Sequence, residues 1–183
     1  VAVSGSGNVA QFAVEKAMAF GAKVITVSDS SGTIVDEAGF TPEKLAILAE
    51  VKNHLYGRVS DYAERIGAKF IPGERPWRVP VDVALPCATQ NELSEDDAAM
   101  LIKNGVICVA EGANMPCTAG AVKRFEHAKV LFAPGKASNA GGVATSGLEM
   151  SQQAMRLFWS HEEVDARLQE IMRAVHNSCL RYG

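Results

Sequence analysis

Short runs of apolar residues alternate along the chain with longer stretches in which apolar residues recur every three or four positions. The short runs predict buried strands, and the periodic stretches predict helices that pack on a sheet. The predicted strands are 1–4, 23–28, 69–71, 81–85, 106–110 and 130–133. The predicted helices are 8–20, 42–54, 60–66, 94–103, 118–127, 136–158 and 162–181. This alternation predicts an α/β fold, a doubly wound, mostly parallel sheet with helices on both faces.

Turn residues refine this pattern at several points. Residues 32–40 (GTIVDEAGF) predict a tight hairpin or an extended loop, and residues 72–80 predict an irregular segment. Thr41 and Pro42 predict the start of a helix, because threonine caps helices and proline suits their first turn. Ser94 predicts another helix start, since three acidic residues follow it where the helix dipole favours negative charge.

The first predicted strand leads directly into the turn Gly5-Ser6-Gly7-Asn8-Val9-Ala10. Gly5 can adopt a tight turn, Gly7 leaves room for backbone N–H groups to approach a pyrophosphate, and Ala10 lets the next helix pack closely on the strand. The helix start adds unpaired N–H groups that favour phosphate. This order of strand, glycine turn and helix predicts a Rossmann-type dinucleotide site.

The loops after the predicted strands are rich in small and polar residues. In doubly wound sheets, ligands bind beyond the carboxyl ends of the strands, so these loops are the candidate cofactor site. The alternative is that they are only turns. The loops are 4–9, 28–31, 86–91, 111–116 and 134–142.

The residues after the second strand leave the choice of cofactor open. Asp29 lies about 20 residues past the glycines, where an acid binds the ribose hydroxyls of NAD and repels a 2′-phosphate. The hydroxyls of Ser28 and Ser30 could instead donate to that phosphate. Lys52 and Arg58 could reach the same pocket. The alternative for both cations is solvated surface charge. From these residues alone, NAD and NADP are nearly equal candidates.

Two later segments carry candidate polar groups. Asn114 could meet a nicotinamide amide, or it could bond only to local backbone. Gly141 and Gly142 lower helix stability, which suggests close approach by a ligand. Thr145 and Ser146 lie one turn further on and could point at the same space, or bond to the carbonyl one turn back.

Composition excludes several classes of protein. The chain has 183 residues, 48% of them hydrophobic, a net charge of −3 and a pI near 5.8. It shows no nucleic-acid footprint, no signal peptide and no apolar run near the roughly 20 residues of a membrane span. The four cysteines and four histidines lack metal-ligand spacing, so we expect reduced thiols in a cytoplasmic protein and no metal.

No arrangement for nucleophilic catalysis and no convincing general base accompanies the loops. The chain also starts inside a strand without a methionine. We therefore expect a fragment of a longer protein, in which residues 1–183 form one dinucleotide-binding domain and the acid–base groups lie elsewhere.

Four runs together resemble the glutamate dehydrogenase family, most closely its hexameric, NADP-preferring type from bacteria and lower eukaryotes. The resemblance spans the whole chain. The matching runs are 3–10 (VSGSGNVA), 85–92 (LPCATQNE), 110–116 (AEGANMP) and 133–150 (APGKASNAGGVATSGLEM).

The resemblance implies a cofactor domain whose partner domain, with a catalytic lysine and aspartate, is absent. It implies oxidation of L-glutamate to 2-oxoglutarate and ammonia, reversibly, by hydride transfer with NADP in preference to NAD. It also implies a homohexamer of the full-length protein. No catalytic residue is expected in this chain.

The resemblance further implies site residues by position. Gly5, Ser6, Gly7, Asn8 and Val9 would hold the phosphates. The remaining cofactor positions would be Asp29 and Ser30 at the adenosine ribose, Lys52 near a 2′-phosphate, Ala88 and Thr89 along the nicotinamide half, and Asn114 and Asn139 near its amide and ribose.

Ser146 would donate to the side-chain carboxylate of glutamate, with Val143 packing beside it. A related dehydrogenase for leucine, valine or phenylalanine is an alternative, but Ser146 would then lack a partner, which costs about 1–3 kcal/mol. Leu55 occupies a position that is often basic in NADP enzymes, and Arg58 could compensate. The alternative outside the enzymes is a non-catalytic module that binds a nucleotide.

Overall fold

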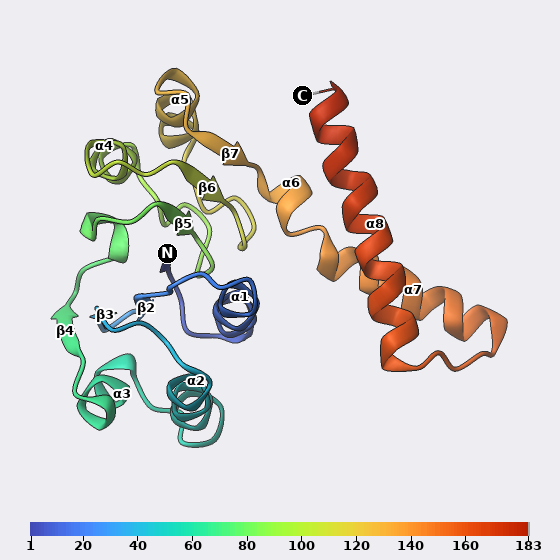
Figure 1. The fold of residues 1–183 in the computed structure, drawn as a ribbon, viewed down its shortest axis with the longest axis horizontal. Coiled ribbons are helices and arrows are strands. Elements are labelled where there is room, and N and C mark those ends of the chain that lie inside the picture. The colour runs from blue at the N-terminus through green and yellow to red at the C-terminus, as the bar shows by residue number, and fades with distance from the viewer. Residues whose placement is uncertain (183) are drawn as a thin grey trace. The chain divides into compact units, whose positions relative to one another are not determined.

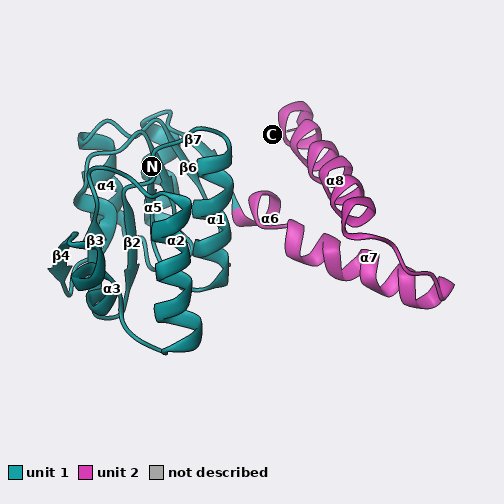
Figure 2. Cartoon of the chain, turned by 60° about the horizontal axis from the view of Figure 1, so that its bottom comes forward, with its two compact units in different colours: residues 1–134 teal, residues 135–183 magenta. Residues whose placement is uncertain are grey.

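The computed structural model describes residues 1–182, and Gly183, the last residue of the predicted domain, lies outside the described residues. The chain divides into two compact units, Val1–Pro134 and Gly135–Gly183, which Figure 2 shows in teal and magenta. Each unit is described by itself. That residues 1–183 act as one dinucleotide-binding domain stays a prediction.

The first unit contains a seven-stranded sheet in the order β4-β3-β2-β1-β5-β6-β7. The strand β1 pairs in parallel with β2 and β5, and β5, β6 and β7 continue in parallel. The strand β3 is antiparallel to both β2 and β4. The strands are β1 (Ala2–Val3), β2 (Thr26–Asp29), β3 (Gly32–Val35), β4 (Lys69–Pro72), β5 (Val83–Leu85), β6 (Cys108–Ala110) and β7 (Leu131–Ala133).

Helices cover both faces of this sheet (Figure 1). The buried core on one face joins α1, α2 and α3 to the strands, with Val14, Leu48 and Tyr62 at its centre. The core on the other face joins α4 and α5, with Leu101 and Phe125 at its centre. The helices are α1 (Asn8–Ala19), α2 (Pro42–Ala49), α3 (Val59–Ile66), α4 (Glu95–Lys103) and α5 (Ala119–His127). The predicted Rossmann-type, mostly parallel α/β fold is confirmed.

Local capping explains where two helices begin. The Thr41 hydroxyl accepts from the backbone N–H of Lys44 at 3.3 Å. At α4, the Ser94 hydroxyl accepts from the N–H of Asp97 at 3.2 Å, and the Asp97 carboxylate accepts from the N–H of Ser94 at 3.0 Å. These bonds satisfy N–H groups that a helix start leaves unpaired, as predicted.

Several predicted boundaries change. The second strand begins at Thr26 rather than at residue 23 and includes Asp29. Residues 32–40 do not form a hairpin by themselves, because residues 32–35 are the strand β3, which pairs with β2. The predicted helix over 42–54 ends as an α-helix at Ala49 and continues as a π-helix, η1 (Glu50–His54). The irregular segment 72–80 contains a 3₁₀ turn, η2 (Pro76–Arg78).

The second unit contains α6 (Gly135–Ser138), α7 (Gly141–Met155) and α8 (His161–Tyr182). The prediction of one helix over 136–158 is wrong, because a turn at residues 139 and 140 separates α6 from α7. The adjacent glycine pair weakens helical continuity there. The helix α7 then ends where Arg156 adopts a left-handed φ of 55°. No described helix is long and apolar enough to span a membrane.

Candidate functional site

The turn between β1 and α1 depends on Gly5. Its φ is 81°, a left-handed value that side chains disfavour. A Cβ at this position would lie 2.9 Å from the carbonyl oxygen of Cys87. The Gly5 N–H donates to the Ser28 hydroxyl at 2.9 Å, which joins the ends of β1 and β2. The conformation of the turn therefore requires glycine at position 5.

Gly7 has a different environment. It caps α1 with an ordinary φ of −80°, and no side chain accepts a capping hydrogen bond. A Cβ placed on it would meet nothing within 4 Å. Gly7, Asn8 and Val9 are exposed, whereas Ala10 is fully buried. An uncapped helix start beside open space fits a pyrophosphate, so these residues suit the cofactor that the turn predicts.

At the end of β2, the carboxylate of Asp29 is already engaged by protein donors. One oxygen accepts from the N–H and the hydroxyl of Ser31 at 2.8 and 2.6 Å. The other accepts from Lys52 Nζ and from the N–H of Val59, both at 3.0 Å. Burial alone would raise the pKa of Asp29, but the bonds from Ser31, Lys52 and Val59 outweigh it and the pKa is lowered. Asp29 is therefore ionised and paired.

Both predicted cations lie at this end of the site. Lys52 Nζ also donates to the carbonyl of Gly57 at 2.8 Å. The Arg58 guanidinium donates to the Ser30 hydroxyl at 2.7 Å. The positive charge of Lys52 offsets the negative charge of Asp29. Arg58 therefore gives the three side chains together a net charge of about +1. Leu55 is 53% exposed and adds no charge.

A pair of side-chain amides, which the sequence analysis missed, connects this end to the glycine turn. Gln11 Nε2 donates to the Ser6 carbonyl at 2.8 Å and to Asn53 Oδ1 at 3.2 Å. Asn53 Nδ2 donates back to Gln11 Oε1 at 3.1 Å. Asn53 follows Lys52 in the π-helix η1, and the two neighbours bind different partners. No periodic pattern marks such a pair in the sequence.

The loops after β5 and β6 are joined by backbone bonds. The N–H groups of Gly112 and Ala113 both donate to the carbonyl of Pro86 at 2.9 Å. Ala88, Thr89 and Asn114 are exposed on these loops, where a ligand can reach them. The structure thus brings the predicted residues of the first unit to one edge of the sheet, beyond the carboxyl ends of its parallel strands.

A buried carboxylate, also missed from the sequence, lies among these loops. Glu92 is 3% exposed, and its Oε1 accepts from the Ser4 hydroxyl at 2.8 Å and from the Ala88 N–H at 2.9 Å. The Ser4 hydroxyl in turn accepts from the Cys87 N–H at 2.9 Å. Burial raises the pKa of Glu92, although bonds from Ala88 and Ser4 and the nearby Arg75 act in the opposite direction.

The second unit carries the remaining predicted residues at and after the start of α7. Val143 is 79% exposed. Ser146 donates to the Gly142 carbonyl at 3.2 Å, and Thr145 donates to the Gly141 carbonyl at 2.9 Å. Both hydroxyls therefore donate to the backbone carbonyl one helical turn earlier, which was the alternative to ligand binding in the sequence analysis. Asn139 lies in the turn before α7. The roles of Asn139, Val143 and Ser146 stay predictions.

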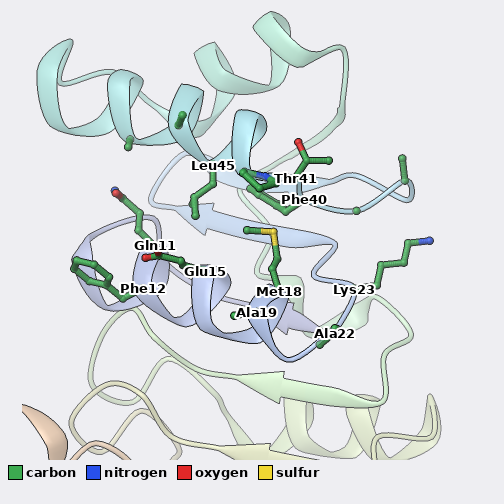
Figure 3. Close-up of a pocket in the computed structure, with 16 residues that line it drawn as sticks. Gln11, Phe12, Glu15, Met18, Ala19, Ala22, Lys23, Phe40, Thr41 and Leu45 are labelled. Atoms are coloured by element: carbon green, nitrogen blue, oxygen red, sulfur yellow. The ribbon is translucent and has the colours of Figure 1, made fainter. Parts of the chain in front are cut away.

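A groove of about 890 Å³ runs between α1 and α2, and Met18 and Leu45 point into it (Figure 3). Its lining is mainly apolar and includes Phe12, which is 67% exposed. None of the predicted cofactor residues lines it. Gln11, which bonds to the Ser6 carbonyl, does line it, so the groove adjoins the glycine turn.

Comparison with known proteins identifies similar sequences and structures. The family model for Glutamate/Leucine/Phenylalanine/Valine dehydrogenase matches residues 1–183. The chain is 67% identical over its full length to an NADP-specific glutamate dehydrogenase of Salmonella typhi and 64% identical to that of Escherichia coli. It spans 41% of the length of each of these relatives. A solved structure of a Plasmodium falciparum glutamate dehydrogenase is similar to the chain, with a TM-score of 0.94 and 47% sequence identity. The match covers 97% of this chain and 38% of the Plasmodium chain.

Proposed function

The chain belongs to the glutamate/leucine/phenylalanine/valine dehydrogenase family, and we propose that it is the NADP-binding part of a glutamate dehydrogenase. The proposed reaction converts L-glutamate and water reversibly to 2-oxoglutarate and ammonia, and NADP would supply the hydride acceptor. The observation that carries the cofactor assignment is the ion pair between Lys52 and Asp29 at 3.0 Å.

The cofactor assignment follows from charge. An unpaired Asp29 would repel a 2′-phosphate, but Lys52 neutralises it and Arg58 adds a positive charge beside the Ser30 hydroxyl. A phosphate is bound well by charge-assisted hydrogen bonds from a guanidinium and an ammonium. Four donors from the protein also occupy Asp29, which leaves it less available to the ribose hydroxyls that NAD offers. NADP is therefore favoured over NAD.

The rest of the cofactor would follow the sheet edge. Gly5, Ser6, Gly7, Asn8 and Val9 would surround the pyrophosphate, with the uncapped start of α1 supplying backbone N–H groups. Asp29 and Ser30 would lie at the adenosine ribose. Ala88 and Thr89 would line the nicotinamide half, and Asn114 and Asn139 would bind near its amide and ribose.

The substrate assignment depends on Ser146 and Val143. In this proposal the Ser146 hydroxyl turns from the Gly142 carbonyl to donate to the side-chain carboxylate of glutamate, while Val143 packs beside the substrate. A dehydrogenase of leucine, valine or phenylalanine has no use for that hydroxyl. The names of the two curated relatives, both NADP-specific glutamate dehydrogenases, also support glutamate.

The proposal places this chain within a longer, cytoplasmic protein. The catalytic lysine and aspartate would come from a preceding substrate domain, so we expect the chain alone to be inactive. The full-length enzyme would form a homohexamer, as the resemblance implies.

Titration of the chain with NADPH and NADH, followed by nicotinamide fluorescence, tests the cofactor. We expect NADPH to bind more tightly than NADH, by tenfold or more. Tighter binding of NADH would refute the assignment through Lys52 and Arg58. Binding of neither dinucleotide would favour the non-catalytic module.

A further inference from the structure

Glu92 connects two loops that are far apart in the sequence. Ser4 precedes the glycine turn, Ala88 lies on the loop after β5, and one carboxylate oxygen of Glu92 binds both. Because the Ser4 hydroxyl also accepts from the Cys87 N–H, Ser4 is held from both directions. The Cys87 N–H and the Leu85 carbonyl already bond Ser4 directly to the start of this loop. Glu92 adds a connection from Ser4 to the Ala88 N–H, further along the loop.

Burying a carboxylate costs free energy unless its oxygens are well bonded. Here the structure provides donors from two loops, and the Arg75 guanidinium donates to the main-chain carbonyl of Glu92. Its raised pKa shows that burial outweighs these contacts. A neutral acceptor such as a glutamine amide could hold the same two donors at a lower desolvation cost.

The loop that Glu92 holds is the one that presents Ala88 and Thr89. Both residues are exposed, whereas Ser4 and Glu92 are buried beneath them. A shift of the Ala88 backbone would change the distance between the nicotinamide side of the site and the start of α1. It would leave the group around Lys52 and Asp29 unchanged, because Glu92 has no bond to that group.

Resting on the function proposed above, we propose that Glu92 is a positioning residue for the dinucleotide. Through Ser4 and Ala88 it sets the separation between the phosphate-binding turn and the loop that lines the nicotinamide half. Glu92 touches neither half of the cofactor. Its effect is confined to ligands that must reach across both loops.

Two probes separate this role from a general effect on folding. NADPH spans both halves of the site, whereas 2′,5′-ADP contains adenosine with its 2′- and 5′-phosphates and lacks the nicotinamide half. In the chain, we expect Glu92→Ala to raise the Kd of NADPH about tenfold and to change the Kd of 2′,5′-ADP less than twofold. Ser4→Ala removes the hydroxyl that donates to Glu92, so it should also raise the Kd of NADPH while changing the Kd of 2′,5′-ADP less than twofold.

Two further variants act as rescue and control. Glu92→Gln keeps an oxygen that can accept from Ser4 and Ala88, so it should restore NADPH binding to within about threefold of the unmodified chain. Asp36→Asn changes another buried carboxylate, which follows β3 at the opposite edge of the sheet. It should leave both ligands unaffected.

The outcomes are distinguishable. Unchanged NADPH binding in Glu92→Ala, or equal weakening of both ligands, would overturn the positioning role. Should Glu92→Ala fail to fold, judged by its circular dichroism, Ser4→Ala and Glu92→Gln decide the question in the same way. If the unmodified chain binds neither NADPH nor 2′,5′-ADP, the proposed function itself fails.

Discussion

The ammonium group of Lys52 lies 3.0 Å from the carboxylate of Asp29, and it also donates to the Gly57 carbonyl at 2.8 Å. The lysine and the aspartate come from different elements, η1 and β2. Their side chains are 17% and 11% exposed, so water screens the pair only partly. Under the proposed function, this pair lets a position suited to ribose hydroxyls accept a 2′-phosphate.

Replacing Lys52 should alter the choice between the two dinucleotides. In Lys52→Met, Asp29 loses its cation and repels a 2′-phosphate. We expect the Kd of NADPH to rise at least tenfold and the Kd of NADH to change less than threefold, measured by nicotinamide fluorescence. The matched control is Lys44→Met, which removes the cation that pairs with Asp36. Equal losses for both dinucleotides in Lys52→Met would contradict the prediction.

The lowered pKa of Asp29 predicts how stability depends on pH. A carboxylate whose pKa is lower in the folded state stabilises that state above its unfolded pKa, about 3.9, and this stabilisation is lost as pH falls through the folded pKa. Asp29→Asn should therefore lower the free energy of unfolding at pH 7 by about 1–3 kcal/mol. The difference from the unmodified chain should shrink below pH 3.9.

Urea unfolding at several pH values measures this effect. Trp77 is fully buried in the first unit and reports on that unit, and the background change Trp159→Phe removes the other tryptophan. A difference that stays constant from pH 7 to pH 3 would mean that the charge of Asp29 does not matter.

Gly5 and Gly7 should respond differently to the same substitution. Gly5→Ala forces a side chain into a left-handed φ and against the Cys87 carbonyl, so we expect a loss of about 1–3 kcal/mol in unfolding free energy. Gly7→Ala meets open space at an ordinary φ and should leave stability within about 0.5 kcal/mol.

Gly7→Ala should nevertheless weaken NADPH binding about tenfold, because the methyl group occupies space that the pyrophosphate needs. Thermal melting and fluorescence titration of both variants test this contrast. Normal NADPH affinity in Gly7→Ala would place the pyrophosphate elsewhere.

Ser146→Ala tests the substrate. In the complete dehydrogenase that we propose contains this chain, the variant should raise the KM for glutamate about tenfold or more, since a hydrogen bond to a charged group contributes about 1.5–3 kcal/mol. NADPH affinity should stay nearly the same. Thr145→Val is the neighbouring control, because Thr145 makes the same kind of local bond. Normal glutamate kinetics in Ser146→Ala would exclude this role.

The fold was predictable because its signals are local. Apolar runs such as 81–85 mark buried strands, and the capping groups Thr41 and Ser94 mark helix starts. Loops that follow parallel strands share one sheet edge by topology alone, which is why the predicted residues of the first unit gather there. The break after α6 had a local signal in Gly141 and Gly142, which we interpreted as a sign of ligand approach within one helix.

Contacts between distant side chains could not be predicted. Ser4 and Glu92 are 88 positions apart, and Gln11 and Asn53 are 42 apart. Neither spacing carries a period or a motif, because the fold brings these residues together only after the sheet has formed. The ion pair between Lys52 and Asp29 could not be predicted either, because the sequence analysis left open whether Lys52 lies in this pocket or on the solvated surface.

Under the proposed function, the π-helix η1 makes the number of residues before Lys52 a determinant of dinucleotide choice. A π-turn contains one more residue than the α-helical turn it replaces, and each residue of an α-helix turns the chain by about 100°. We expect deletion of Val51 to remove this extra residue and to turn Lys52 away from Asp29, at the cost of one buried side chain of the core. Under the proposed function, a single-codon deletion could thus shift dinucleotide preference without changing any ligand-binding side chain, a route that substitution scans do not sample.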